Sequence, residues 1–311
     1  MADYRPEMGS EEAAGAADLS GKTVVVTGGS AGIGVETIRV LAARGAHVIS
    51  VVRDRPKGEA ALAEIRASLP DSAIELAVMD LSDLESVRKG ADAIAAAHPR
   101  IDMLINNAGV MAAPLSRTRE GLELHLGTNF LGHYVLTARL MNNLLAAAPA
   151  RVINLTSSAH RLSPFRLHDP FFEKEDYNKL VAYGQSKTAN VLMTLELDRR
   201  YRDRGVRATA VHPGLIDTEL GRYFTEEEMV FLKGGIPEGM GMKTVSQGAA
   251  TTLWAACIED FGAIAGRFCE DCAVADEISH PDENGRGVLP HALDMDMAAK
   301  VWALGEQWSG E

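Results

Sequence analysis

The stretch TVVVTGGSAGIG, residues 23–34, decides the fold of this chain. Residues 22–27 are rich in β-branched side chains and show no polar alternation, as expected for a strand that is buried on both faces. Glycines follow at Gly28, Gly29, Gly32 and Gly34, and a helical pattern then runs to Ala43. A strand, a glycine-rich turn and a helix N-terminus form a phosphate site, because free backbone N–H groups and the helix dipole both favour an anion there. The stretch therefore predicts a pyrophosphate-binding turn at the start of a parallel α/β unit.

Strands and helices alternate along the remaining chain. Short apolar runs predict further strands at 47–52, 74–79, 101–105, 152–156 and 206–211, and near 266–270. Helical patterns occupy 57–68, a segment that starts at Ser82-Asp83, 121–145, the region around 183–201, a segment from Ser246, and 291–308. This order is typical of a doubly wound fold. We predict a single Rossmann domain over residues 21–311, with a mainly parallel seven-stranded sheet.

Composition excludes several functional classes. The 311 residues include 46% hydrophobic ones, enough for a full core, and the formal net charge is −12, which argues against nucleic acid or an anionic membrane as a partner. Three cysteines are too few for a disulfide framework and fit a reducing cytoplasm. No apolar run is long enough for a membrane anchor, and residues 1–20 are acidic without an apolar stretch. We expect those residues to form a flexible tail.

Polar residues at three strand ends should line a cofactor crevice. Arg53 follows the second strand, where an acidic residue would bind ribose hydroxyls and an arginine favours a 2′-phosphate. We therefore expect NADP(H), with NAD(H) as the alternative because Asp54 could compete for the ribose. The third strand is followed by Asp80-Leu81, where Asp80 is either an adenine contact or a helix cap. The fourth is followed by Asn106-Asn107-Ala108-Gly109, whose small side chains and amides let a cofactor ring lie close.

Tyr183 and Lys187 lie four residues apart, which places both side chains on one face of a helix. An ammonium near a phenol favours the phenolate, so such a tyrosine can serve as an acid or a base. The pair alone can also arise by chance on an exposed helix. Residues 215–243 form an irregular stretch with adaptable apolar side chains and glycines, which suits either a substrate lid or a loop that covers the core.

Six motifs occur in one order: Thr27-Gly28-x-x-x-Gly32-x-Gly34, Asn106-Asn107-Ala108-Gly109, Asn129, Ser158, Tyr183-x-x-x-Lys187 and Pro213-Gly214. Together they resemble the short-chain dehydrogenase/reductase family over about residues 20–275. The phrases Ser158-Ala159-His160 and Ser186-Lys187-Thr188-Ala189-Asn190, with the long excursion between Ser158 and Tyr183, are similar to the branch that contains retinol dehydrogenases and the WW-domain oxidoreductase.

The resemblance implies roles for these residues. Tyr183 would transfer the proton, Lys187 would lower its pKa and hold the nicotinamide ribose, Ser158 rather than Ser157 would polarise the substrate oxygen, and Asn129 would hold a water. The cofactor would contact Gly28, Ser30, Gly32, Ile33 and Gly34 at its pyrophosphate, and Pro213, Gly214, Ile216 and Thr218 around its nicotinamide.

The predicted activity is that of an NADP(H)-dependent alcohol dehydrogenase or carbonyl reductase acting on a bulky apolar substrate. Two alternatives stay open: a double-bond reductase, since the branch is also similar to light-dependent protochlorophyllide reductase, and a non-catalytic cofactor-sensing scaffold. Related proteins often form homodimers through the two long helices, here 121–145 and 181–203. We expect no metal site, because the nine histidines include no H-x-x-x-H pair and Cys269-x-x-Cys272 has no second cysteine pair.

Overall fold

Eight strands form one sheet in the computed structural model, which describes residues 3–216, 218–228, 242–280 and 285–311. The order across the sheet is β3-β2-β1-β4-β5-β6-β7-β8. Strands β1 to β7 run parallel, and β8 pairs antiparallel with β7. The predicted Rossmann class is confirmed, with one more strand than the seven expected. The strands are β1 (Thr23–Thr27), β2 (His47–Val52), β3 (Ile74–Val78), β4 (Met103–Asn106), β5 (Ala150–Leu155), β6 (Val206–His212), β7 (Phe268–Glu270) and β8 (Ala273–Val274).

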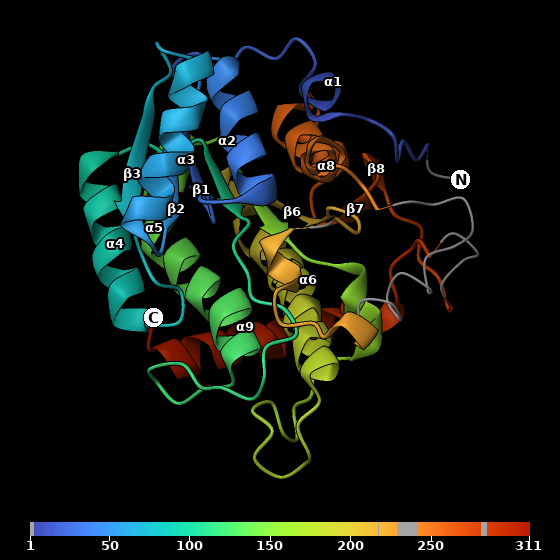
Figure 1. Cartoon of the computed structure of the whole chain (residues 1–311). Coiled ribbons are helices and arrows are strands. Elements are labelled where there is room, and N and C mark those ends of the chain that lie inside the picture. The colour runs from blue at the N-terminus through green and yellow to red at the C-terminus, as the bar shows by residue number, and fades with distance from the viewer. Residues whose placement is uncertain (1–2, 217, 229–241, 281–284) are drawn as a thin grey trace.

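Helices cover both faces of the sheet (Figure 1). Successive side chains of a strand point to opposite faces, so Val24 and Val26 contact one apolar cluster while Val25 contacts the other. One cluster holds side chains of α1, α2, α3 and α8, and the other those of α4, α5, α6 and α9. None of the described helices combines the length and apolar character that a bilayer crossing requires. The helices are α1 (Ser10–Ala14), α2 (Gly32–Ala43), α3 (Arg55–Ser68), α4 (Leu84–Ala97), α5 (His133–Ala147), α6 (Lys179–Tyr201), α8 (Val245–Cys257) and α9 (Met295–Ser309).

The N-terminal segment is docked on the domain and is not the flexible tail expected. Met8, Ala14 and Leu19 are buried, because α1 packs against α8 and α2. The Ser10 hydroxyl donates to Glu36 Oε1 at 2.5 Å. Glu11 also contacts this helix. Its carboxylate pairs with the guanidinium group of Arg39 on α2 at 2.8 Å and with that of Arg44, the residue that follows α2, at 2.9 Å. Apolar burial and these polar contacts together fix residues that the acidic composition alone would leave in solvent.

The C-terminal helix α9 lies against α5 and α6 (Figure 1). Trp302 is buried there, with its ring centroid 5.0 Å from that of Tyr134 on α5. Every side chain of α6 from 182 to 198 is buried within the chain itself. The helix faces through which a homodimer was expected are therefore occupied in part by α9.

The sheet order reverses between β1 and β4, because β2 and β3 extend to one side of β1 and β4 to β8 to the other. Connections that leave β1 and β4 diverge at their carboxyl ends and leave a crevice between them. The glycine turn after β1 and the Asn106–Gly109 segment after β4 both lie at this position.

Candidate active site

A cavity of about 390 Å³ opens at the carboxyl edge of the sheet. Every residue predicted to bind the cofactor lines it, and so do Ser158, Tyr183 and Lys187. Among the predicted site residues, Asn129 alone does not line the cavity. The predicted lining residues are Gly28, Ser30, Gly32, Ile33, Gly34, Arg53, Asp80, Leu81, Asn107, Ala108, Gly109, Pro213, Gly214, Ile216 and Thr218.

The glycine turn brings backbone close to one side of the cavity. Gly28 and Gly32 have positive φ angles, 79° and 56°, which favour glycine. A Cβ on Gly28 would lie 2.8 Å from the amide nitrogen of Asn107. Helix α2 begins at Gly32 behind Ala31, whose methyl group cannot cap it, so the first-turn N–H groups remain for an anion. This geometry fits a pyrophosphate.

Two cationic residues lie at the end of the cavity next to β2. Arg53, Asp54 and Lys57 all line it, and Asp54 Oδ1 also caps α3 by accepting from the Lys57 N–H at 3.0 Å. Lys57 was not among the predicted residues, although its position in the first turn of the helix after Arg53 was a usable signal. Asp80 lines the cavity while accepting from Ser82 N at 2.9 Å, and Asp83 caps α4.

The segment after β4 is held to the glycine turn by Thr27. The Thr27 hydroxyl accepts from the N–H groups of Asn107 and Ala108, both at 2.9 Å. The Asn107 amide donates to the Thr27 carbonyl at 2.7 Å, and that of Asn106 donates to Asn154 Oδ1 at 2.7 Å inside the sheet. These bonds fix the separation of the two cavity walls.

Tyr183 and Lys187 share one face of α6 at the inner end of the cavity. The Lys187 ammonium lies 5.6 Å from the Tyr183 ring centroid and donates to the Leu155 carbonyl at 3.2 Å. Burial raises the pKa of Tyr183 to about 12, while a hydrogen bond with Ser157 acts in the opposite direction. Burial also lowers the pKa of Lys187 to about 8. The spacing of Tyr183 and Lys187 predicts a lowered tyrosine pKa, but desolvation of the buried side chain raises it instead.

The two neighbouring serines, Ser157 and Ser158, differ in what their side chains contact. Ser157 and Ser158 both line the cavity, but the side chain that hydrogen-bonds Tyr183 is that of Ser157. Ser157 has an extended backbone, φ −160° and ψ 157°, and Ser158 begins the following 3₁₀ turn with its N–H donated to His212 Nδ1 at 3.3 Å. Counting back from Tyr183 could not separate the two neighbours, because it does not show which hydroxyl points inward.

Asn129 lies in a π-helical segment, Leu126–Gly132, and is fully buried. Its side-chain oxygen accepts from Val110 N at 2.8 Å, and its amide donates to the Val110 carbonyl and the Ser186 hydroxyl, both at 2.9 Å. The Asn129 carbonyl accepts from the His133 ring at 2.9 Å. π-Segments of this kind often occur at functional sites. Here the residue links the helix to the segment after β4 and to α6.

A second buried network, missed from the sequence, lies behind Tyr183. The His125 ring is 6.0 Å from that of Tyr183. Its Nε2 accepts from Ala113 N at 3.2 Å, so Nδ1 carries the proton and donates to the Glu123 carboxylate at 2.7 Å. The Tyr177 hydroxyl donates to the Ala113 carbonyl at 2.9 Å. These contacts give Tyr183 a rigid neighbour.

Known proteins share this fold and much of this sequence. The profile of the short chain dehydrogenase family matches residues 22–229. Retinol dehydrogenase 12 from Homo sapiens is 43% identical over 295 residues, which cover 93% of this chain and 88% of that protein. A crystal structure of an uncharacterised protein from Mycobacterium paratuberculosis superimposes with a TM-score of 0.74 at 35% identity, covering 96% of this chain and 97% of that one.

A second solved structure, the Pseudomonas aeruginosa RhlG/NADP active-site complex, is 25% identical with a TM-score of 0.65 and covers 81% of this chain and 95% of its own. The profile match spans more than half of the chain, and the retinol dehydrogenase match spans nearly all of it. The chain belongs to the short-chain dehydrogenase/reductase family and is an oxidoreductase with retinol dehydrogenases among its relatives.

Proposed function

We propose that the chain is an NADP(H)-dependent oxidoreductase that transfers hydride between nicotinamide and the carbonyl or alcohol carbon of a bulky apolar substrate. One observation carries the proposal: Ser157, Tyr183 and Lys187 line the same cavity as the glycine turn. A proton donor and a pyrophosphate site in one cavity are what nicotinamide-dependent carbonyl reduction requires.

A bound nicotinamide would supply the hydride, and the protein groups would handle the proton. Because burial raises the pKa of Tyr183 to about 12, its hydroxyl keeps its proton at neutral pH and can donate it to a carbonyl oxygen. Ser157 beside it would give a second hydrogen bond where negative charge develops. The Lys187 ammonium, 5.6 Å from the ring, would stabilise the phenolate that remains. Alcohol oxidation would run the same proton transfer in reverse, with the Tyr183 phenolate accepting the proton of the alcohol.

The preference for NADP(H) rests on the two cations beside β2. Arg53, Asp54 and Lys57 line the cavity, and one oxygen of the Asp54 carboxylate caps α3. A 2′-phosphate would gain charge-assisted hydrogen bonds from these cations, each worth about 1.5–3 kcal/mol. Arg53→Gln should therefore lower the NADPH over NADH ratio of kcat/KM by about 10-fold or more. A strong NADH preference of the wild-type protein would contradict this part of the proposal.

The proposed substrate is large and apolar. Val110, Met111, Leu215 and Leu220 line the cavity, and a relative is named retinol dehydrogenase. We propose a retinoid-like or similarly extended aldehyde or ketone, with residues 215–243 closing over it. Nearly half of that segment, residues 217 and 229–241, lies outside the described part of the chain.

The decisive experiment is NADPH oxidation with all-trans-retinal and with aromatic, terpenoid and steroid-like carbonyls, using NADH as the control. Tyr183→Phe should lose at least ~100-fold in turnover while still binding NADPH, because only the transferred proton is removed. Near wild-type turnover by that variant would refute the assignment. Product analysis with a conjugated enone separates carbonyl from double-bond reduction. Tight NADPH binding without turnover of any carbonyl would favour the non-catalytic scaffold.

A further inference from the structure

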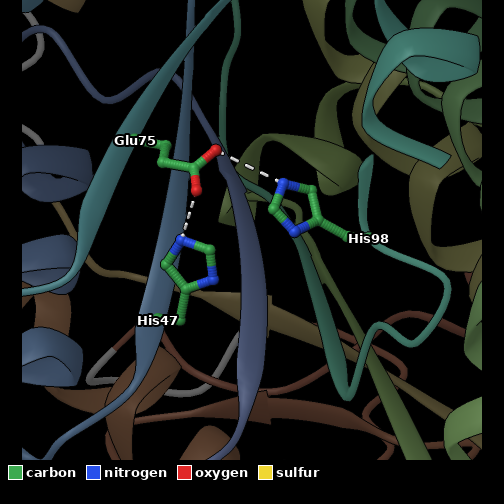
Figure 2. A group of neighbouring side chains, drawn as sticks. All are labelled: His47, Glu75 and His98. Atoms are coloured by element: carbon green, nitrogen blue, oxygen red, sulfur yellow. Dashed lines mark ion pairs between the residues drawn. The ribbon is translucent and has the colours of Figure 1, made fainter. Parts of the chain in front are cut away.

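Three side chains with metal-ligating atoms meet away from the active site (Figure 2). One oxygen of the Glu75 carboxylate lies 2.8 Å from His47 Nε2, and the other lies 3.3 Å from His98 Nε2. The ligand atoms of all three residues lie within 4.8 Å of one another. Among the described residues, this is the group of histidine, cysteine and acidic side chains that is close enough to hold one metal ion.

Each ligand comes from a different element at the amino edge of the sheet. His47 begins β2, Glu75 is the second residue of β3, and His98 directly follows α4. The residues are far apart in sequence, so a search for histidine pairs on one helix could not find them. The cavity lies at the opposite, carboxyl edge, which separates this group from hydride transfer.

The three ligands have the chemistry of a zinc site. Two imidazoles and a carboxylate suit Zn²⁺ and similar divalent ions, with solvent completing the coordination. With bonds of about 2.0–2.1 Å, neighbouring ligand atoms in a coordination sphere lie about 3.0–3.4 Å apart. The observed separations of 2.8 and 3.3 Å are close to that range. Side-chain exposures of 30% for His47, 54% for Glu75 and 14% for His98 leave a path for the ion.

We propose that His47, Glu75 and His98 bind a Zn²⁺-like divalent ion that ties β3 to β2 and to the end of α4. β3 is an edge strand of the sheet and, within the described part of the chain, pairs with β2 alone. Such edges are points of local opening that proteins secure by additional contacts. The ion would take the place of the Nε2 protons that face the carboxylate, while each neutral imidazole keeps its one ring proton on Nδ1.

The test is calorimetric titration of Zn²⁺ into untagged, chelator-treated full-length protein. We expect one ion per chain and at least about 10-fold weaker binding in His98→Gln and Glu75→Gln, since even outer-shell changes at metal sites cost about 10–100-fold. The matched control is His168→Gln, which alters an exposed histidine–glutamate pair of 2.7 Å that has no second histidine in the described structure. That control should bind Zn²⁺ as the wild type does, and Mg²⁺ should not compete.

Two further readouts separate a site from loose chelation. Zn²⁺ should raise the melting temperature of the wild type but not of His98→Gln, while NADPH binding by His98→Gln stays unchanged. Absence of saturable one-to-one binding, equal binding by His98→Gln, or equal loss in His168→Gln would each overturn the proposal.

Discussion

At the scale of single residues, the active site depends on which way a hydroxyl points. Ser157 is extended, so its side chain and that of Ser158 leave the chain in different directions, and the hydroxyl of Ser157 reaches Tyr183. The backbone of Ser157 is held in place by His160, because His160 Nδ1 donates to the Ser157 carbonyl at 2.8 Å. The serine next to Tyr183 is therefore determined by backbone geometry after β5.

Ser157→Ala should lower kcat for carbonyl reduction by about 100-fold, the usual loss when one hydrogen bond to a developing oxyanion is removed. Ser158→Ala should retain activity within about threefold, since its hydroxyl is not the one beside Tyr183. Steady-state kinetics of both variants with saturating NADPH check this. The reverse ranking would return the role to Ser158.

At the scale of elements, the sequence predicted most of the sheet and its helices because their signals are local. β1 and β2 carry short apolar runs, and their observed limits agree with the expected ones within a residue, as does the end of α2 at Ala43. β8 was not predicted, because it has only two residues and follows a turn without glycines. Asp271 and Cys272 adopt the positive φ angles of that turn, 48° and 57°. α1 escaped because its five residues are stabilised by partners far along the chain, such as Ser246 on α8.

Because α1 is docked on the domain, a substitution of one of its buried residues should lower the stability of the protein, whereas a substitution in a flexible tail should not. Ala14 is buried against the domain, whereas Ala16 two residues later is exposed. Ala14→Asp should lower the free energy of unfolding by about 1–3 kcal/mol, because it buries a carboxylate without a partner. Ala16→Asp, with the same change of charge, should stay within about 0.5 kcal/mol of the wild type. Urea denaturation measures both, and equal stabilities would mean that the segment is detached in solution.

At the scale of the whole molecule, buried titratable groups couple stability to pH. Burial lowers the pKa of His133 and His160 to about 4 and that of His212 to about 3. The unfolded chain, with histidine pKa near 6.5, then binds more protons than the folded chain below that pH, so stability falls on acidification. Glu270 opposes this, because burial raises its pKa to about 7 and the folded state takes up a proton as the pH falls.

The free energy of unfolding should therefore drop by on the order of 6 kcal/mol between pH 6.5 and 4, with each of the three histidines contributing on the order of 3 kcal/mol and Glu270 offsetting about one of them. Glu270→Gln removes the offset, so the loss between pH 7 and 5 should be larger in this variant than in the wild type. Urea denaturation at the two pH values tests the sign. A smaller loss in the variant would show that Glu270 is ionised in the folded protein at acidic pH.

The position of α9 decides how two copies of the chain could meet. Gly305 lets α9 approach α5, because a Cβ there would lie 2.9 Å from the Tyr134 ring. Arg139 on α5 pairs with Glu311 at 2.8 Å, just beyond the end of α9. Pairing of two copies through α5 and α6 would have to displace these contacts. We therefore expect the wild-type chain to be a monomer in sedimentation velocity experiments.

Gly305→Leu should push α9 away from α5 and expose the apolar side chains beneath it. Leucine is a better helix former than glycine, so any loss of stability must come from the lost packing rather than from helix propensity. We expect a loss of about 1–3 kcal/mol together with concentration-dependent self-association. The matched control is Ala303→Leu, which adds an apolar side chain at an exposed position of the same helix and should remain monomeric. A wild-type dimer that keeps α9 in place, or self-association of the control to the same extent, would show that this helix does not govern assembly.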